Sequence, residues 1–245
     1  MRVIASYSIK GGVGKTSTAV NLAYLAGRDG QRTLLWDLDP QAAATYLFRV
    51  RPRVKGGGAA LIRGRRPAQA AVKGTDFENL DLLPADFTYR NMDLELDASK
   101  RSGQRLALLL ATLAGEYDTV VLDCPPSVSL VSENVLRAAD TLVVPLIPTT
   151  LSLRTFDQLT GFIAGLPGRH PALIAFFSMV DRRKTLHRQV VADLPAQRPG
   201  ISAVGIPAAS LVEQMAVHRS PVPVFAGRSQ ISRAYEQLWA EVRAA

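Results

Sequence analysis

The sequence predicts an α/β protein built on a doubly wound, mostly parallel sheet with helices on both faces. Short apolar, β-rich runs alternate with longer helix-like stretches along most of the 245 residues. Several of these runs are apolar at consecutive positions, as in strands that are buried on both faces of a parallel sheet. A glycine-rich loop joins the first run to the first helix-like stretch. Together these features favour parallel strands linked by crossover helices.

The individual elements can be assigned in order along the chain. The strands are predicted over Val3–Ser8, Thr33–Trp36, Leu80–Leu83, Thr119–Leu122, Thr141–Leu146, Leu173–Phe177 and Ile201–Ile206. The helices are predicted over Lys15–Arg28, Gly103–Ala114, Leu130–Ala138, Ser152–Gly165, Leu186–Leu194, Ala208–Arg219 and Ser229–Val242. Glycines at 56–58 and prolines at 52 and 67 indicate a less regular stretch. We therefore expect one domain over residues 1–245, with a basic surface insertion at about 49–75.

The composition favours a soluble globular protein. Hydrophobic residues make up 47% of the chain and charged residues 20%, which is enough apolar material for a core. We expect no transmembrane helix, because no stretch of about 18 uncharged apolar residues exists. The first apolar run leads into Lys10 and the glycine loop rather than into a signal-peptide pattern. The single cysteine, Cys124, excludes a disulfide within the chain. These features predict a cytoplasmic protein.

The net charge of +8 is concentrated in one segment. Residues 49–75 read RVRPRVKGGGAALIRGRRPAQAAVKGT and hold eight Lys or Arg with no Asp or Glu. Because this excess equals the net charge of the whole chain, the other residues sum to zero. A local basic patch is typical of polyanion binding, although a solvated basic surface has the same composition. The sequence leaves both interpretations open.

The residues KGGVGKTST at 10–18 have the composition of a phosphate-binding loop. Glycines let backbone N–H groups wrap an anion, and a helix that follows adds its dipole. Lys15 is placed to contact the β- and γ-phosphates, and the Thr16 hydroxyl is placed to bind Mg²⁺. The match to the usual motif is imperfect, because Ile9 occupies its first glycine position. The nucleotide-binding residues predicted for the loop are Gly11, Gly12, Val13, Gly14, Lys15, Thr16 and Ser17.

Three aspartates follow predicted strands. Asp37 and Asp39 lie in LLWDLDPQ, and Asp123 lies in TVVLDCPPS. The carboxyl ends of parallel strands share one edge of a sheet, where ligands bind, so these side chains should meet the phosphate loop. One carboxylate could hold Mg²⁺ through water while another orients an attacking water. A single aspartate after a strand could instead cap a helix, but three beside a phosphate loop favour the nucleotide site.

These segments resemble a known family. KGGVGKTSTAVNLA, LLWDLDPQ and VVLDCPP are similar to the deviant Walker A, Walker A′ and Walker B motifs of the ParA/MinD family of P-loop ATPases. The order and spacing of the motifs resemble ParA-type proteins over essentially the whole chain. The resemblance implies a P-loop NTPase fold, ATP and Mg²⁺ as cofactors, and ATP hydrolysis coupled to reversible homodimerisation.

The resemblance also implies a role for each matching residue. Lys10 corresponds to the signature lysine that reaches the phosphates of the partner subunit in an ATP-bound sandwich dimer, and Lys15 corresponds to the phosphate lysine. Asp39 matches the aspartate that orients the attacking water. A cation supplied in trans would stabilise charge on the γ-phosphoryl oxygens, as an arginine finger does. The metal-site residues implied are Thr16, Asp37 and Asp123.

Within this family the chain looks like a short ParA-like protein. The C-terminal SQISRAYEQLWAEVRAA has apolar residues at helical spacing, which favours a packed helix over a basic membrane anchor. We expect non-specific DNA binding, nucleoid association, no membrane contact, and positioning of a cargo such as a plasmid, a chromosome or a carboxysome. A ParB-like or cargo-adaptor partner should stimulate hydrolysis. The alternatives are a MinD-like membrane-associated regulator and a metabolic P-loop ATP-dependent ligase.

Further residues are assigned to the base pocket and to DNA. By resemblance, Met179, Asp181 and Pro207 lie near the adenine. The three histidines show no metal-ligand spacing and are expected at the surface: His170, His187 and His218. Because Lys and Arg bind phosphate backbones without sequence preference, basic residues outside the 49–75 segment are also candidates for DNA contact. These are Arg182, Arg183, Lys184, Arg188 and Arg219.

Overall fold

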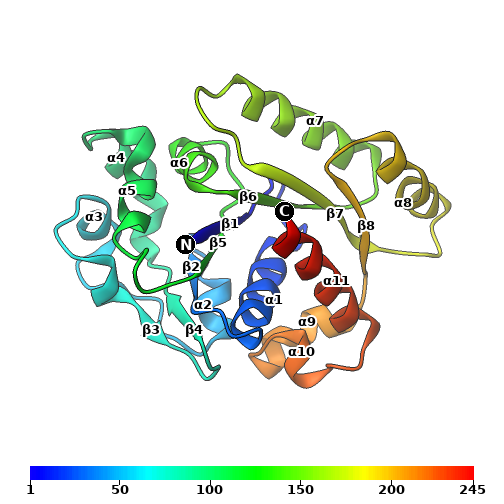
Figure 1. Cartoon of the computed structure of the whole chain (residues 1–245), viewed down its shortest axis with the longest axis horizontal. Helices are drawn as coiled ribbons and strands as arrows, with labels where there is room; N and C mark the ends of the chain where they lie inside the picture. Colours follow the sequence, from blue (N-terminus) through cyan, green and yellow to red (C-terminus); the bar gives the residue numbers. More distant parts are fainter.

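The computed structural model describes residues 1–245, and its centre is a single eight-stranded sheet (Figure 1). The strand order is β3-β4-β2-β5-β1-β6-β7-β8, and neighbouring strands are parallel except β3 with β4. The predicted mostly parallel α/β architecture is therefore confirmed. The strands are β1 Arg2–Ser6, β2 Thr33–Asp37, β3 Lys73–Gly74, β4 Leu80–Leu83, β5 Thr119–Asp123, β6 Thr141–Leu146, β7 Ala172–Val180 and β8 Ile201–Pro207.

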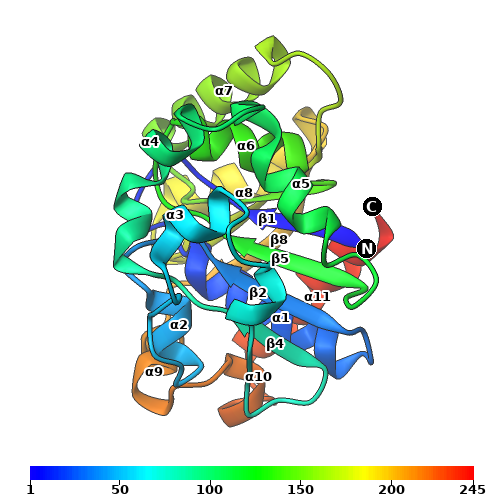
Figure 2. The ribbon, with the colours of Figure 1, turned by 90° about the vertical axis from the view of Figure 1, so that its left-hand side faces the viewer.

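Helices cover both faces of this sheet. Figure 2 shows α3 to α7 on one side of the strands, and α1, α2, α9, α10 and α11 on the other. The α-helices are α1 Lys15–Arg28, α2 Ala43–Leu47, α3 Gly57–Ile62, α4 Met92–Asp97, α5 Arg105–Ala111, α6 Leu130–Ala138, α7 Thr150–Gly165, α8 Thr185–Gln197, α9 Ser210–His218, α10 Val222–Phe225 and α11 Gln230–Ala244. Short 3₁₀ turns occur at η1 Ala68–Ala71, η2 Phe87–Asn91 and η3 Ser102–Gln104.

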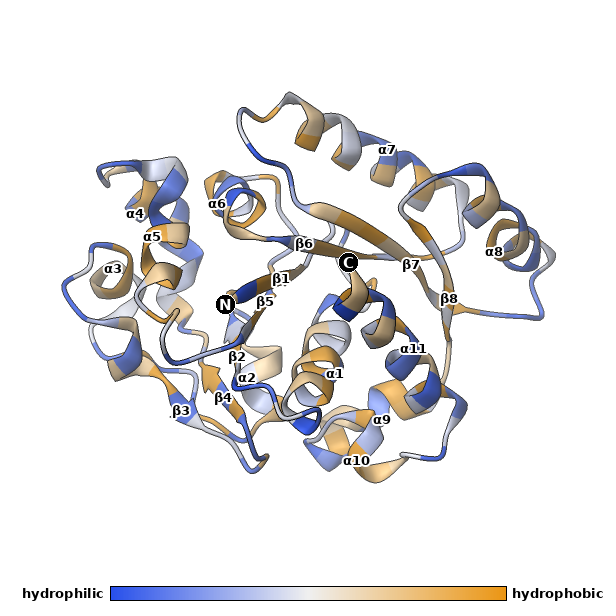
Figure 3. Cartoon of the chain, in the orientation of Figure 1, coloured by the Kyte–Doolittle hydropathy of each residue, from blue (hydrophilic) through white to orange (hydrophobic).

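Buried strand residues alternate between two hydrophobic cores. Leu34 and Trp36 of β2 belong to the core beneath α3 to α8, whereas Leu35 belongs to the core shared with α1 and α11. Both sides of a central strand are thus removed from water, which explains why the strands are apolar at consecutive positions. Figure 3 shows hydrophobic residues along β6 and β7, and a mixture of hydrophobic and hydrophilic residues on α7.

Several short elements between β2 and β5 are absent from the sequence prediction. They are α2, α3, η1, β3, η2 and α4, each too short to show a helical or strand period. The basic insertion at 49–75 is therefore partly regular. It contains α3 and η1, and its strand β3 extends the sheet at the β4 edge in the antiparallel sense. The predicted helix over Gly103–Ala114 begins instead as the turn η3, and α10 is a further unpredicted element.

The C-terminal helix α11 packs into the protein, as predicted. Ile231, Tyr235, Leu238 and Val242 are buried in the core that also contains α1. The indole N–H of Trp239 donates to a carboxylate oxygen of Asp29 at the end of α1, at 2.8 Å. No helix in the structure combines the length and the apolar character that crossing a bilayer requires.

Candidate nucleotide-binding site

The ends of three central strands bring the predicted site residues together. β1 leads into the glycine loop, while β2 and β5 end at Asp37 and Asp123. In the parallel register, Asp123 is the partner of both Ser6 and Asp37. The loop and these carboxylates therefore meet at the carboxyl edge of the sheet, as the sequence predicts.

The glycine loop enters α1 through backbone conformations that favour glycine. Gly12 has a φ of 70° and Gly14 a φ of 95°, and α1 begins directly after Gly14. A Cβ atom at Gly14 would lie 3.0 Å from the hydroxyl oxygen of Ser178 on β7. A side chain at this position would therefore be strained by the dihedral angle and crowded by Ser178. The free N–H groups of the first turn of α1 remain available for an anion.

Lys15 is buried at the start of α1, beside the loop. Its ammonium Nζ donates to the carbonyl oxygen of Lys10 at 3.0 Å, and its own carbonyl accepts from the Ser6 hydroxyl at 2.8 Å. Burial lowers the pKa of the Lys15 ammonium, and the carboxylates of Asp123 and Asp39 oppose that change. The positive charge is thus held against the loop backbone and close to both carboxylates.

Lys10 differs from Lys15 in its exposure and in its side-chain contacts. Its side chain is exposed, and its ammonium makes no hydrogen bond or ion pair within the chain. Its backbone N–H donates weakly to the Ser8 hydroxyl at 3.3 Å. The loop therefore presents one lysine inward and one lysine outward.

Asp123 is the best-placed carboxylate for a metal ion. It is completely buried, and neither of its oxygens has a hydrogen-bond partner. Burial raises the pKa of Asp123 well above its usual value, and the neighbouring Asp37 carboxylate raises it further. The nearby Thr16 hydroxyl opposes the rise, although it does not meet hydrogen-bond geometry. Such a pair of unsatisfied buried oxygens requires a cation or a proton.

The donor set fits Mg²⁺ held partly by phosphate and water. No three His, Cys, Asp or Glu side chains form a metal cage within the chain. Mg²⁺ in nucleotide sites usually keeps several waters and binds one or two carboxylates plus the phosphates of the substrate. The unpaired oxygens of Asp123 beside the Thr16 hydroxyl match this mode of binding.

Asp37 is occupied by the turn that follows it. Its Oδ2 accepts from the backbone N–H of Thr45 at 2.8 Å and from the Thr45 hydroxyl at 2.7 Å. Its Oδ1 accepts from the backbone N–H of Asp39 at 3.2 Å. Burial raises the pKa of Asp37 to about 6, against the effect of the Thr45 bonds. The carboxylate thus organises the β2–α2 connection, and its predicted role at the metal stays a prediction.

Asp39 lies on this connection and is half-buried. Its Oδ1 accepts from the backbone N–H of Gln41 at 2.9 Å, whereas no hydrogen bond within the chain uses its Oδ2. The preceding residue, Leu38, donates its N–H to the carbonyl of Asp123 at 2.9 Å. These bonds fix the Asp39 carboxylate at the carboxyl edge with one oxygen free.

A cavity of about 460 Å³ adjoins the loop, between α1 and the ends of β7 and β8. Its size and its largely apolar lining with a few polar groups are those of a small-molecule pocket. Of the predicted base-pocket residues, Met179 and Pro207 line it and Asp181 does not. The lining residues that were not predicted are Ser178, Ile206, the segment 208–210 with Val212 and Glu213, and Tyr235 of α11. The position of Pro207 hints at the segment after β8, but no local signal brings α11 to this cavity.

Asp181 instead holds the turn between β7 and α8. Its carboxylate accepts from Nε and Nη2 of Arg183 at 2.9 and 3.0 Å, and its backbone N–H donates to Nδ1 of His187 at 3.1 Å. His187 is only 3% exposed, so the expectation of a surface histidine is wrong. Its ring is buried because it satisfies the N–H of this turn. Burial also lowers the pKa of His187, in keeping with a ring nitrogen that accepts a hydrogen bond.

The predicted DNA-contacting residues fall in two places. Four of them lie on the β7–α8 turn and at the start of α8, and all four are exposed: Arg182, Arg183, Lys184 and Arg188. Arg183 is paired with Asp181, as described above. Arg188 donates to the carbonyl of Arg182 at 3.0 Å and to the Thr185 hydroxyl at 3.1 Å. Two of the four cations are therefore already engaged within the turn.

Arg219 lies apart from these four, directly after α9. Its Nε donates to the carbonyl of Tyr46 in α2 at 3.0 Å, and its guanidinium lies 4.5 Å from the centre of the Tyr46 ring. Its φ of 48° is unusual for a side-chain-bearing residue. The structure thus uses Arg219 to join α9 to α2.

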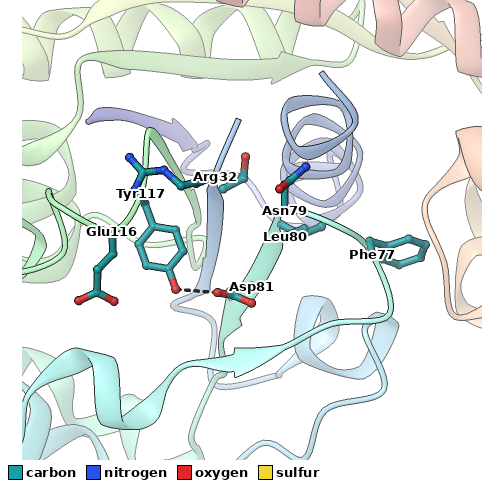
Figure 4. Close-up of a pocket in the computed structure, with 8 residues that line it drawn as sticks. Arg32, Phe77, Asn79, Leu80, Asp81, Glu116 and Tyr117 are labelled. Atoms are coloured by element: carbon teal, nitrogen blue, oxygen red, sulfur yellow. Dashed lines mark hydrogen bonds between the residues drawn. The ribbon is translucent and has the colours of Figure 1, made fainter. Parts of the chain in front are cut away.

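A second hollow, of about 270 Å³, lies at the opposite edge of the sheet (Figure 4). Arg32, Thr33 and Leu80 line it where β2 and β4 begin, and Tyr117 donates its hydroxyl to Asp81 at 2.8 Å. This hollow is at the amino ends of the strands. It is therefore separate from the glycine loop, which follows the carboxyl end of β1.

Comparisons with known proteins place the chain among its relatives. Residues 1–170 match the family model described as an AAA domain. The chromosome partitioning protein ParA of Caulobacter vibrioides is 33% identical over 99% of this chain and 94% of its own length. The sporulation initiation inhibitor protein Soj of Bacillus subtilis is 30% identical over 99% of this chain and 98% of its own length.

A solved structure is similar along most of the chain. The cobyrinic acid a,c-diamide synthase of Mycobacterium smegmatis, with bound ADP and magnesium, superposes with a TM-score of 0.77 and 30% sequence identity. The match covers 89% of this chain and 91% of that one. Together with the glycine loop, the outward and inward lysines and the aspartates at the strand ends, these similarities show that the chain belongs to the ParA/MinD family of P-loop ATPases.

Proposed function

We propose that this protein is a ParA-like ATPase that binds ATP with Mg²⁺, dimerises around the nucleotide and binds DNA without sequence preference. The observation that carries the proposal is the contrast between the two lysines of one loop. Lys15 is buried and suits the phosphates bound by its own chain. Lys10 is exposed and has no partner within its chain, so it suits the phosphates bound by a second copy.

The nucleotide site combines the loop with the adjoining cavity. We assign the triphosphate to residues 11–17 and the base to the cavity lined by Met179 and Pro207. The solved Mycobacterium smegmatis structure with ADP and magnesium supports this choice of ligands. Thr16 and Asp123 would hold Mg²⁺, which when bound neutralises phosphate charge. Asp37, through Thr45, orders the turn that carries Asp39.

In this proposal, hydrolysis depends on Asp39 and on two lysines, one from each copy of the chain. The free Oδ2 of Asp39 is available to orient an attacking water. Lys15 and the Lys10 of a second copy would both stabilise charge on the γ-phosphoryl oxygens. Loss of the γ-phosphate removes the main partner of Lys10, so hydrolysis would release the dimer.

The cellular role is proposed from the partition relatives. The similar proteins include a chromosome partitioning protein. We infer that the ATP-bound dimer associates with nucleoid DNA and positions a cargo, which could be a plasmid, a chromosome or a protein complex. A ParB-like or cargo-adaptor protein would stimulate hydrolysis and so release the DNA.

Nucleotide-dependent dimerisation is the direct test. Light scattering with ATP and Mg²⁺ should show a dimer for the wild type, a monomer for Lys10→Ala, and a dimer for the control Lys100→Ala, which changes another exposed lysine. Lys10→Ala should still bind ATP, because Lys15 is intact. A wild type that stays monomeric with ATP and Mg²⁺ would contradict the proposal.

A second candidate is a metabolic ATP-dependent enzyme, because the Mycobacterium smegmatis relative is named a cobyrinic acid a,c-diamide synthase. Turnover that requires a small-molecule acceptor and no dimer would favour that function. A MinD-like membrane regulator is the other alternative. It would be favoured by ATP-dependent co-sedimentation with liposomes.

A further inference from the structure

The segment 49–75 carries most of its positive charge free of acidic partners. Two of its eight cations make ion pairs, Arg49 with Asp76 at 2.9 Å and Arg63 with Glu95 at 2.7 Å. Because the rest of the chain has no net charge, the remaining cations are the main source of the positive field of the molecule. These unpaired residues are Arg51, Arg53, Lys55, Arg65, Arg66 and Lys73.

Four of the unpaired cations line a single groove of about 500 Å³. Arg51, Arg53 and Lys55 come from the loop between α2 and α3, and Lys73 comes from the edge strand β3. The other lining residues are Val50, Ala70 and Ala71, so no acidic side chain lines the groove. Cations around a small apolar surface suit a sugar–phosphate strand, whose phosphates need positive charge and whose sugars need close approach.

The loop that lines the groove is anchored to the protein core. Val54 is buried, and its backbone N–H donates to Oδ2 of Asp86 at 2.7 Å. The other carboxylate oxygen of Asp86 accepts from the N–H and the hydroxyl of Thr88. Arg53 and Lys55 flank Val54 and are exposed. Anchoring Val54 therefore presents both cations to solvent together, which reduces the ordering cost of binding.

The basic turn before α8 is a weaker candidate for DNA contact. Asp181 pairs with Arg183, and Arg188 is bound to the turn itself. Figure 1 shows α8 and the β3 edge at opposite ends of the sheet. The two basic surfaces can therefore be altered separately.

We propose that Arg51, Arg53, Lys55 and Lys73 form the main contact of this protein with the phosphate backbone of double-stranded DNA. This inference rests on the DNA binding in the proposed function, and it places that binding on the 49–75 segment instead of on α8. An acidic segment of a partner protein is the other polyanion that the charge would attract, and the experiment separates the two.

The test compares three quadruple variants by fluorescence anisotropy of a labelled duplex of random sequence. The groove variant is Arg51→Gln, Arg53→Gln, Lys55→Gln and Lys73→Gln. The charge-retaining variant is Arg51→Lys, Arg53→Lys, Lys55→Arg and Lys73→Arg. The α8 variant is Arg182→Gln, Arg183→Gln, Lys184→Gln and Arg188→Gln. Affinities are measured with ATP and Mg²⁺ over a series of salt concentrations, with polyglutamate as competitor, and ATP-dependent dimerisation is checked for each protein.

For the groove variant, log affinity should fall less steeply with log salt concentration. The slope should be shallower by about 3 to 4, close to one unit for each cation removed. The charge-retaining variant should keep the slope to within about one unit. All three variants should still dimerise with ATP, because these side chains lie outside the nucleotide site.

Four results would overturn the inference. The groove variant could bind DNA as the wild type does, or the α8 variant could lose the larger share of the slope. Polyglutamate could displace DNA at equal charge concentration, which would indicate an acidic protein partner. A wild type that dimerises with ATP yet binds no DNA would remove the inference and the DNA part of the proposed function, while leaving the ATPase part intact.

Discussion

The Asp37 carboxylate and the Thr45 hydroxyl are 2.7 Å apart, and this bond joins the end of β2 to the first helix after it. The same hydroxyl accepts from the backbone N–H of Ala85, just beyond β4, at 2.9 Å. One buried threonine thus connects two strand ends and the turn that carries Asp39. The position of Asp39 at the carboxyl edge depends on this connection.

Replacing Thr45 by valine should destabilise the protein by about 3 kcal/mol. The substitution keeps the shape of the side chain but removes the hydroxyl, which leaves the N–H of Ala85 buried without a partner and deprives Asp37 of a donor. Urea unfolding monitored by circular dichroism measures the change. Thr45→Ser keeps the hydroxyl and should cost only about 1 kcal/mol for the lost methyl group. Equal costs for the two variants would contradict the role of the hydroxyl.

Replacing Gly14 by alanine should weaken nucleotide binding by about 5- to 150-fold. The new methyl group would meet the Ser178 hydroxyl at 3.0 Å on a backbone whose φ is 95°, and such strain costs on the order of 1–3 kcal/mol. Isothermal titration with ATP and Mg²⁺ measures the affinity.

Gly161 supplies a matched control for this prediction. It lies within α7, and a Cβ atom there would meet nothing within 4 Å. Gly161→Ala should therefore leave nucleotide affinity unchanged and stabilise the fold by about 0.5–1 kcal/mol. If both glycine variants bound nucleotide equally well, the tight fit at Gly14 would be unimportant for the loop.

Replacing Asp39 by alanine should give a protein that dimerises with ATP and hydrolyses it slowly. The carboxylate makes its one side-chain bond to the N–H of Gln41, so its removal should disturb the turn little. Loss of a group that orients or activates water typically lowers turnover by about 100-fold or more. Phosphate release and light scattering on the same sample measure both properties, and turnover close to that of the wild type would exclude the proposed role.

Replacing Asn21 by leucine should destabilise the protein by about 1–3 kcal/mol. Asn21 is fully buried in α1, where its amide donates to the carbonyl of Ser17 and its oxygen accepts from the N–H of Val222. Leucine has a similar size but leaves that N–H unpaired. Thermal unfolding checks the change. A destabilisation well below about 1 kcal/mol would contradict the role of this contact.

The central sheet and the core of the site were predictable because their signals are local. Strands buried on both faces give runs of apolar residues, and the loop at 10–18 carries its glycines and lysines in one segment. Asp37 and Asp123 could be brought together in advance because parallel strands end at a common edge. The register that pairs these two residues confirms that reasoning.

The rest of the site depends on contacts between distant segments. Tyr235 reaches the cavity from α11, and Ser178 limits the loop from β7. Thr45 lies in a helix of five residues, too short to show a period. His187 was expected at the surface, but its ring is buried and accepts a hydrogen bond from the backbone N–H of Asp181. In each case a hydrogen bond or a packing contact decides the role, and neither is visible in the local sequence.

Residues 49–75 at the β3 edge carry the whole net charge of +8, and the rest of the chain carries none. This uneven distribution gives the molecule an electric dipole moment. The electric field of a polyanion orients such a protein before contact. Its first encounters therefore involve the basic end preferentially. At an ionic strength of 0.1 M, salt would screen this orienting field at distances beyond about 10 Å. The unequal distribution of charge would therefore influence how quickly the protein finds a polyanion, in addition to how tightly it is held.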